Sequence, residues 1–121
     1  MGSSFYVSAA GAPWAFSREQ LADALARHWP GATVSDVFER FVEIHAEVAP
    51  GQVAELSFHK EHKVFSFADR EPWSAALTVL HTVLGELAPG VPAVWWIDFD
   101  GTLEPLELSL PLEQFIDDFG A

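Results

Sequence analysis

The stretch FVEIHAEVAPGQVAELSFHKEHKVFSF, residues 41–67, decides the fold of this chain. Apolar and polar side chains alternate through most of it, and a period of two is typical of β-strands that bury one face. Pro50-Gly51 predicts a first turn and Lys60-Glu61 a second. The stretch therefore predicts three antiparallel strands in a meander, with Leu56 opposite Phe65 and the apolar side chains on one common face.

Helical signals flank this meander on both sides. Before it, Ser17 is a good N-cap with Gln20 three residues later, and Pro30-Gly31 ends the helix. After it, a stripe of apolar residues at helical spacing predicts a second helix over residues 70–87. A third, short helix near the C-terminus is predicted from the i, i+3, i+4, i+7 spacing of Leu112, Phe115, Ile116 and Phe119.

Strands are expected outside the meander as well. Residues 4–10 and 33–37 are expected to form short strands, and residues 93–99 and 102–108 a hairpin around Asp100-Gly101, because Asp-Gly favours two-residue turns. No internal repeat, low-complexity tract or linker interrupts the chain. The sequence thus predicts a single α+β domain over residues 1–121. We expect a mainly antiparallel sheet of about five to six strands, with two longer helices and a short C-terminal helix packed on one face.

Composition excludes several classes of protein. Half of the 121 residues are apolar, and ten Phe and five Trp supply large side chains for a core. The absence of cysteine excludes disulfides, thiolate metal ligands and a cysteine nucleophile. No apolar run approaches the length of a membrane span, and the N-terminus lacks the features of a secretory signal. We therefore expect a cytoplasmic protein that does not bind membranes.

Charge is distributed unevenly along the chain. The net charge at pH 7 is −12, from 18 acidic and 6 basic residues. Every Lys and Arg lies before position 71, whereas residues 71–121 carry nine acids and no basic residue. A field of this sign repels nucleic-acid phosphates and attracts basic proteins. Direct nucleic-acid binding is not expected, and two interpretations stay open: a basic protein partner, or an acidic surface that simply keeps the chain soluble.

The sharpest motif is the run Ile97-Asp-Phe-Asp-Gly-Thr102. An apolar strand that ends in Asp-x-Asp-Gly-Thr resembles the first motif of haloacid dehalogenase-type phosphatases, which would make Asp98 a nucleophile and Asp100 an acid/base beside Mg²⁺. That family also needs a long doubly wound domain after the motif, with a Lys and further acidic ligands. Only 19 residues follow Thr102, and Lys63 is the last Lys. We therefore interpret the motif as the turn of a hairpin, and expect neither catalytic residues nor a cofactor.

Histidines and glutamates form a second candidate site. If the apolar faces of the first hairpin agree, Glu43 is expected opposite His59 and His45 opposite Ser57, while His62 comes from across the next turn. Glu43, His45, His59 and His62 would then share one polar face. Imidazole and carboxylate groups bind zinc and other divalent ions, but they are also common on solvated faces. A metal or small-molecule site and an ordinary polar face both remain open.

A surface for a protein partner is the third candidate. Adjacent side chains on a strand point to opposite faces, so one ring of Trp95-Trp96 is expected in the core and the other is available as an anchor. Exposed aromatic residues or an unpaired sheet edge leave a homodimer as an alternative. The predicted partner-binding residues are these two tryptophans and the acids that follow them, namely Trp95, Trp96, Asp98, Asp100, Glu104, Glu107, Asp117 and Asp118.

The layout of the chain is similar to that of bacterial immunity proteins of polymorphic toxin systems. Phe5-Tyr6-Val7 leads to the capped helix that starts around Phe16 to Leu21, and an acidic hairpin and tail run from Trp96 to Phe119. The resemblance implies a protein without catalytic groups that caps a basic toxin, often a nuclease, by presenting carboxylates where the toxin expects phosphate. We therefore expect a non-enzymatic acidic binding protein with a basic protein as its partner.

Overall fold

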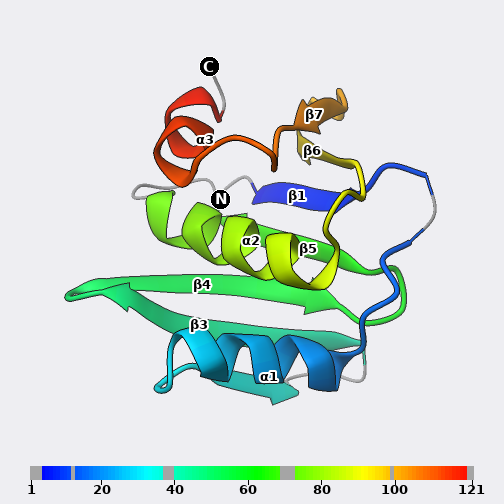
Figure 1. Ribbon diagram of the computed structural model, residues 1–121. Coiled ribbons are helices and arrows are strands. Elements are labelled where there is room, and N and C mark those ends of the chain that lie inside the picture. Colours follow the sequence, from blue (N-terminus) through cyan, green and yellow to red (C-terminus); the bar gives the residue numbers. More distant parts are fainter. Residues whose placement is uncertain (1–3, 12, 37–39, 69–72, 99, 120–121) are drawn as a thin grey trace.

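The computed structural model describes residues 4–11, 13–36, 40–68, 73–98 and 100–119. The fold of these residues is α+β, as predicted, with three helices and one antiparallel sheet (Figure 1). The sheet has seven strands and not the expected five to six, since each segment that was expected to be extended joins it, the short edge strands included. In chain order the elements are β1 (Ser4–Ala9), α1 (Arg18–His28), β2 (Thr33–Asp36), β3 (Phe41–Ala49), β4 (Gln52–His59), β5 (Val64–Ala68), α2 (Ser74–Leu87), β6 (Ala93–Ile97), β7 (Glu104–Leu106) and α3 (Leu112–Asp118).

The strands follow the order β2-β3-β4-β5-β1-β6-β7 across the sheet. The first strand of the chain lies between β5 and β6, so it joins the predicted meander β3-β4-β5 to the C-terminal strands. The two outer strands are short, four residues in β2 and three in β7. Arg18 donates from Nη2 to the carbonyl of Val34 in β2 at 3.2 Å, and β7 contains Pro105, which has no N–H.

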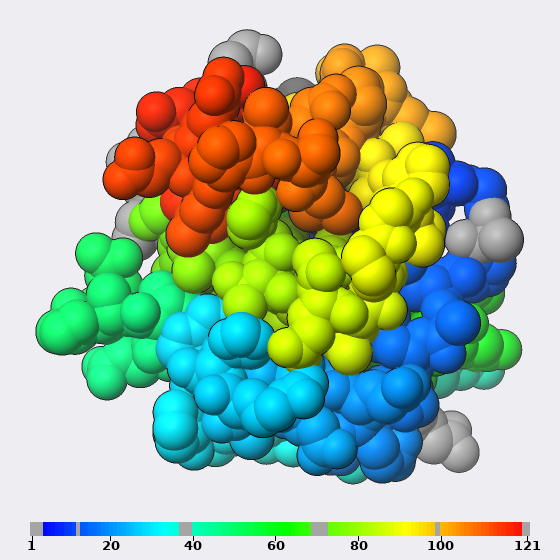
Figure 2. Space-filling view, viewed as in Figure 1, coloured from blue at the N-terminus to red at the C-terminus, as the bar shows by residue number. Residues whose placement is uncertain are grey.

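All three helices lie on one side of the sheet (Figure 1). Helix α2 packs on β3 and β4, and contacts α1 on one flank and α3 on the other. In the space-filling view from this side, the helices and the loops beside them hide most of the sheet (Figure 2). None of the described helices is long and apolar enough to cross a lipid bilayer.

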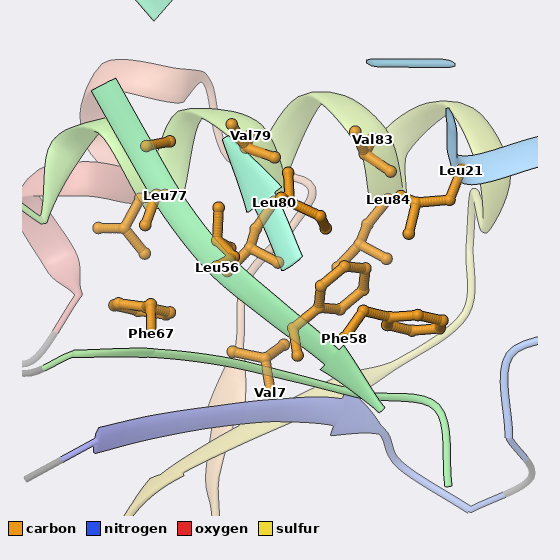
Figure 3. Close-up of a cluster of buried hydrophobic side chains, with 14 of the residues drawn as sticks. Val7, Leu21, Leu56, Phe58, Phe67, Leu77, Val79, Leu80, Val83 and Leu84 are labelled. Carbon is orange, nitrogen blue, oxygen red and sulfur yellow. The ribbon is translucent and has the colours of Figure 1, made fainter. Parts of the chain in front are cut away.

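Apolar residues from α2 and the central strands fill the space between the helices and the sheet. Leu77, Leu80 and Leu84 of α2 are buried and point toward Leu56 and Phe58 of β4 (Figure 3). Complete burial of such a side chain stabilises the fold by about 1.5–3 kcal/mol. No polar or charged residue among those described is buried, so the core is held by apolar packing.

A second group of rings fills the core near the C-terminus. Phe5 in β1 lies 5.4 Å from Phe67 and 5.2 Å from Phe119, measured between ring centroids. Phe119 directly follows α3 and also lies 4.7 Å from the ring of Trp95 in β6. These contacts attach α3 to the β1–β6 part of the sheet.

The helices begin and end largely where the sequence signals predict. At the start of α1, the Ser17 hydroxyl accepts from the backbone N–H of Gln20 at 3.2 Å, and the Gln20 side chain accepts from the backbone N–H of Ser17 at 2.8 Å. The predicted capping box is thus confirmed, and Trp29 is the C-cap. Helix α2 begins at Ser74, and the predicted start at residue 70 lies outside the described residues.

The predicted register of the meander is wrong by two residues in both hairpins. Ser57, and not His59, lies opposite Glu43, and a bulge between Glu47 and Ala49 adjusts this pairing near the turn. In the second hairpin the partner of Phe65 is Phe58 in place of Leu56. A shift of two residues leaves every side chain on the same face of the sheet, so the alternation of apolar residues does not detect it.

The predicted hairpin at Asp100-Gly101 also differs from the structure. Trp95 pairs with Glu104, and residues 98–103 connect the strands in place of a two-residue turn. The backbone N–H groups of Asp100 and Gly101 both donate to the carbonyl of Ile97, at 3.2 and 2.9 Å. Gly101 adopts φ 77°, which glycine accepts without strain. The expected extension of the strand to Phe99 lies outside the described residues.

Candidate functional site

The Lys and Arg residues that the structure describes lie in the β2–β5 half of the molecule, where they contact acceptors of the same chain. Arg18 and Lys60 both approach Asp36, at 3.3 and 3.4 Å. The ammonium group of Lys63 donates to the backbone carbonyl of Phe16 at 2.8 Å. Two further ion pairs join Arg27 to Glu86 and Arg40 to Glu61. The positive charge of the described residues is therefore largely compensated within this half.

Asp36 shows the electrostatic effect of this arrangement. Partial desolvation alone would raise the pKa of its carboxyl group, but hydrogen bonds from Arg18 and Lys60, together with their two charges, outweigh it. The pKa of Asp36 is therefore held below its ordinary value. This carboxylate, on an edge strand, is already bound by two cations of the same chain.

The opposite half of the molecule carries the acids that follow Glu86 in the chain. Strands β6 and β7, helix α3 and their connections lie together at one end, in yellow to red (Figures 1 and 2). No ion pair joins these acids to a Lys or Arg of the described chain. The acids at this end, called here the acidic end, are Asp98, Asp100, Glu104, Glu107, Glu113, Asp117 and Asp118.

Trp95 and Trp96 point to opposite sides of the sheet, as predicted from their positions on one strand. Trp95 faces the helices and lies 4.7 Å from Phe119, whereas the ring of Trp96 stacks on that of Tyr6 at 5.5 Å with an interplanar angle of 15°. Both indoles are half-buried. Because the rings lie on different sides, they cannot serve as one aromatic anchor.

The predicted partner-binding acids are likewise divided between the two sides of the sheet. Glu104 pairs with Trp95 and so shares the helix side, where α3 carries Asp117 and Asp118. Asp98 directly follows β6 and, two residues after Trp96, lies on the same side of the sheet as Trp96, away from the helices. Its Oδ2 accepts from the backbone N–H of Ser4 at 3.1 Å. The predicted set therefore shares one end of the molecule and surrounds an edge of the sheet there.

The carboxylates of the phosphatase-like motif have local partners. Asp98 accepts from the N–H of Ser4, and Asp100 accepts from the hydroxyl of Thr102 at 2.8 Å. The strand before the motif lies between two antiparallel neighbours, β1 and β7. The doubly wound parallel sheet implied by the phosphatase resemblance is not the fold of the described residues.

The predicted histidine and glutamate set separates into two pairs. Nε2 of His45 lies 3.7 Å from a carboxylate oxygen of Glu43. The rings of His59 and His62 stack at 4.6 Å, and Nδ1 of His59 accepts from the backbone N–H of His62 at 3.0 Å. The corrected register separates the two pairs, because Ser57 takes the place expected for His59. Within the described ranges, no three His, Asp or Glu residues are grouped to hold a metal ion.

One side of the sheet has no helix over it among the described elements, and we call it the uncovered face (Figure 1). Cross-strand pairing defines a row over five strands on this face. A hollow of about 140 Å³ lies beside part of the row, and its lining includes hydroxyl and carboxylate groups. The row consists of Glu43 in β3, Ser57 in β4, Ser66 in β5, Tyr6 in β1 and Trp96 in β6.

The sequence reasoning missed Tyr6 as a surface residue. Its signal was present, since Tyr6 lies between the core residues Phe5 and Val7 on a strand and must therefore face away from them. The stack with Trp96 could not be read from the sequence, because it depends on β1 entering the sheet beside β6.

An apolar groove lies on the helix side near the acidic end. It has a volume of about 510 Å³ and is formed by the end of α2, the start of β6 and residues 105–109. Glu107 is its one charged lining residue among those described.

Comparison of the chain with protein families, with characterised proteins and with solved structures found no match.

Proposed function

We propose that this protein is a non-enzymatic acidic protein that binds a basic protein, as an inhibitor of the immunity type does. The observation that carries the proposal is the separation of charge. Each described Lys and Arg contacts an acceptor of its own chain within the β2–β5 half, whereas the acids of the acidic end have no basic partner among the described residues. The negative field is thus concentrated at one end of the molecule.

The physical role of this field is to attract and orient a partner. Complementary charge raises the rate of encounter and disfavours partners of the wrong sign. Exposed ion pairs individually contribute only about 0–1 kcal/mol, so tight binding also needs apolar or aromatic contacts. Trp96 and the apolar groove beside Glu107 are surfaces near the acidic end that could supply them.

A pair of charge-matched variants tests the proposal. Glu104→Gln/Glu107→Gln removes two exposed acids from the acidic end, and Glu19→Gln/Asp23→Asn removes two exposed acids from the half that carries the basic residues. Both variants lose the same charge. Affinity for a panel of basic nucleases is measured at increasing salt, and inhibition of each bound nuclease is then assayed.

We expect wild-type affinity to fall steeply with salt, and the acidic-end variant to bind more weakly and with a shallower salt dependence than the control. Equal loss in the two variants would show that only net charge matters. Affinity that does not respond to salt, or no binding to any basic protein, would contradict the proposed function.

A further inference from the structure

We propose that the partner docks on the uncovered face of the sheet, with an arginine of the partner stacked against the Tyr6–Trp96 pair. The inference rests on the proposed function, because it takes a basic protein as the partner. It adds which side of the molecule is bound and which basic side chain is recognised.

Three well-exposed apolar residues lie at separate positions around this face. Phe41 and Val53 are 40% and 50% exposed, and their places in β3 and β4 alternate with the buried residues of those strands. Leu103 is 61% exposed. It immediately precedes Glu104, which pairs with Trp95, so extending the β6–β7 register by one residue places Leu103 beside Trp96. Val53 lies directly opposite Glu47 across the β3–β4 pairing, so a partner that approaches this carboxylate also meets apolar surface.

Charge on the uncovered face selects the kind of partner. No described strand contains Lys or Arg, and the charged side chains that β3 and β4 direct to this face are Glu43, Glu47 and Glu55. Asp98 adds a carboxylate just beyond the strand that carries Trp96. A second copy of this chain would bring the same carboxylates against themselves, whereas a basic segment would neutralise them.

The aromatic pair selects arginine over lysine. The nearly parallel rings of Tyr6 and Trp96 stack on each other, and both side chains remain partly exposed to solvent. A planar guanidinium stacks on an aromatic face and donates to carboxylates at the same time, whereas a lysine ammonium is a compact, strongly hydrated charge. The same cross-strand row ends in Glu43, so a segment lying along it meets an aromatic stack at one end and a carboxylate at the other.

The test uses nona-arginine and nona-lysine peptides as probes, with binding followed by fluorescence anisotropy. Glu43→Gln/Glu47→Gln alters the uncovered face, and Glu19→Gln/Asp23→Asn removes the same charge from α1 on the helix side. We expect the uncovered-face variant to bind nona-arginine about tenfold more weakly than wild type, and the control to lose less than about threefold.

Two further variants examine the aromatic contact. Trp96→Ala is expected to remove the preference for arginine over lysine. Leu103→Ser lies outside the strands at a highly exposed position, so it leaves the fold intact and is expected to weaken both peptides by a few fold. If Trp96→Ala does not fold, the loss of peptide binding in Leu103→Ser is used to test the docking face.

Three outcomes would overturn the docking face. Equal loss in the two charge-matched variants would mean attraction without docking on this face, and would leave the proposed function standing. A dimer in sedimentation that Leu103→Ser dissociates would make this face an interface between copies. Failure of the wild type to bind any basic peptide or protein would overturn the proposed function together with this inference.

Discussion

Replacing Phe119 with alanine removes the ring that attaches α3 to the sheet. The side chain is only 7% exposed, and its ring centroid lies 4.7 Å from that of Trp95, 5.2 Å from Phe5, 6.1 Å from Phe67 and 6.3 Å from Trp73. Removing a buried Phe side chain usually destabilises a protein by about 3–5 kcal/mol. Phe119 lies at the end of a short helix that can partly adjust, so we expect a loss of about 3–4 kcal/mol in the free energy of unfolding.

Urea denaturation followed by circular dichroism measures this loss. Phe41→Ala is the matched control, because the same atoms are removed from a ring that is 40% exposed at the start of β3. We expect the control to lose less than about 1 kcal/mol. If Phe119→Ala were no more destabilising than the control, α3 would not be packed as described, and the acids of α3 would not be held at the acidic end.

Three further predictions concern single positions. Ser17→Ala removes the capping box and should cost about 1 kcal/mol in urea unfolding, and an unchanged midpoint would contradict the described cap. Because the folded-state pKa of Asp36 lies below its ordinary value of 3.8, its stabilising contribution is present above that pH and is lost as the pH falls through the folded value. Urea midpoints between pH 7 and pH 3 should therefore decline less in Asp36→Asn than in wild type, and parallel declines would show that the ion pairs contribute nothing. Gly101→Ala forces alanine into φ 77° and should lower the free energy of unfolding by about 1 kcal/mol or more, whereas Gly31→Ala, at an open position without positive φ, should not; similar melting temperatures would refute the turn.

The sequence was sufficient to assign faces and local caps. Alternation along β3 placed Val42, Ile44 and Ala46 in the core, and the structure buries all three. The cap at Ser17 and the opposite directions of Trp95 and Trp96 were also predicted, because each depends only on residues close in sequence. Local periodicity is enough for predictions of this kind.

The sequence was not sufficient to assign registers. Each hairpin was misplaced by two residues, a shift that keeps apolar side chains together and changes only the turn. In the turn between β4 and β5, for example, Lys63 adopts φ 56°, a left-handed conformation that cannot be predicted from a lysine. The error mattered for the candidate metal set, because the pairing of Glu43 with His59 depended on it.

Contacts between distant segments could not be derived from the pattern of residues. The Tyr6–Trp96 stack exists because β1 lies between β5 and β6. The alternation of apolar and polar residues along a strand does not predict the order of the strands in the sheet. The uneven charge was visible along the chain, but only the order of the strands shows that the acids after Glu86 lie together at one edge of the sheet.

Both outer strands have features that limit growth of the sheet. In β2 the carbonyl of Val34 is already occupied by Arg18, and in β7 Pro105 interrupts a strand of three residues. Free strand edges are where native proteins polymerise into intermolecular sheets, and such interruptions suppress that process. We therefore expect the folded protein to resist edge-to-edge growth into fibres even in concentrated solution.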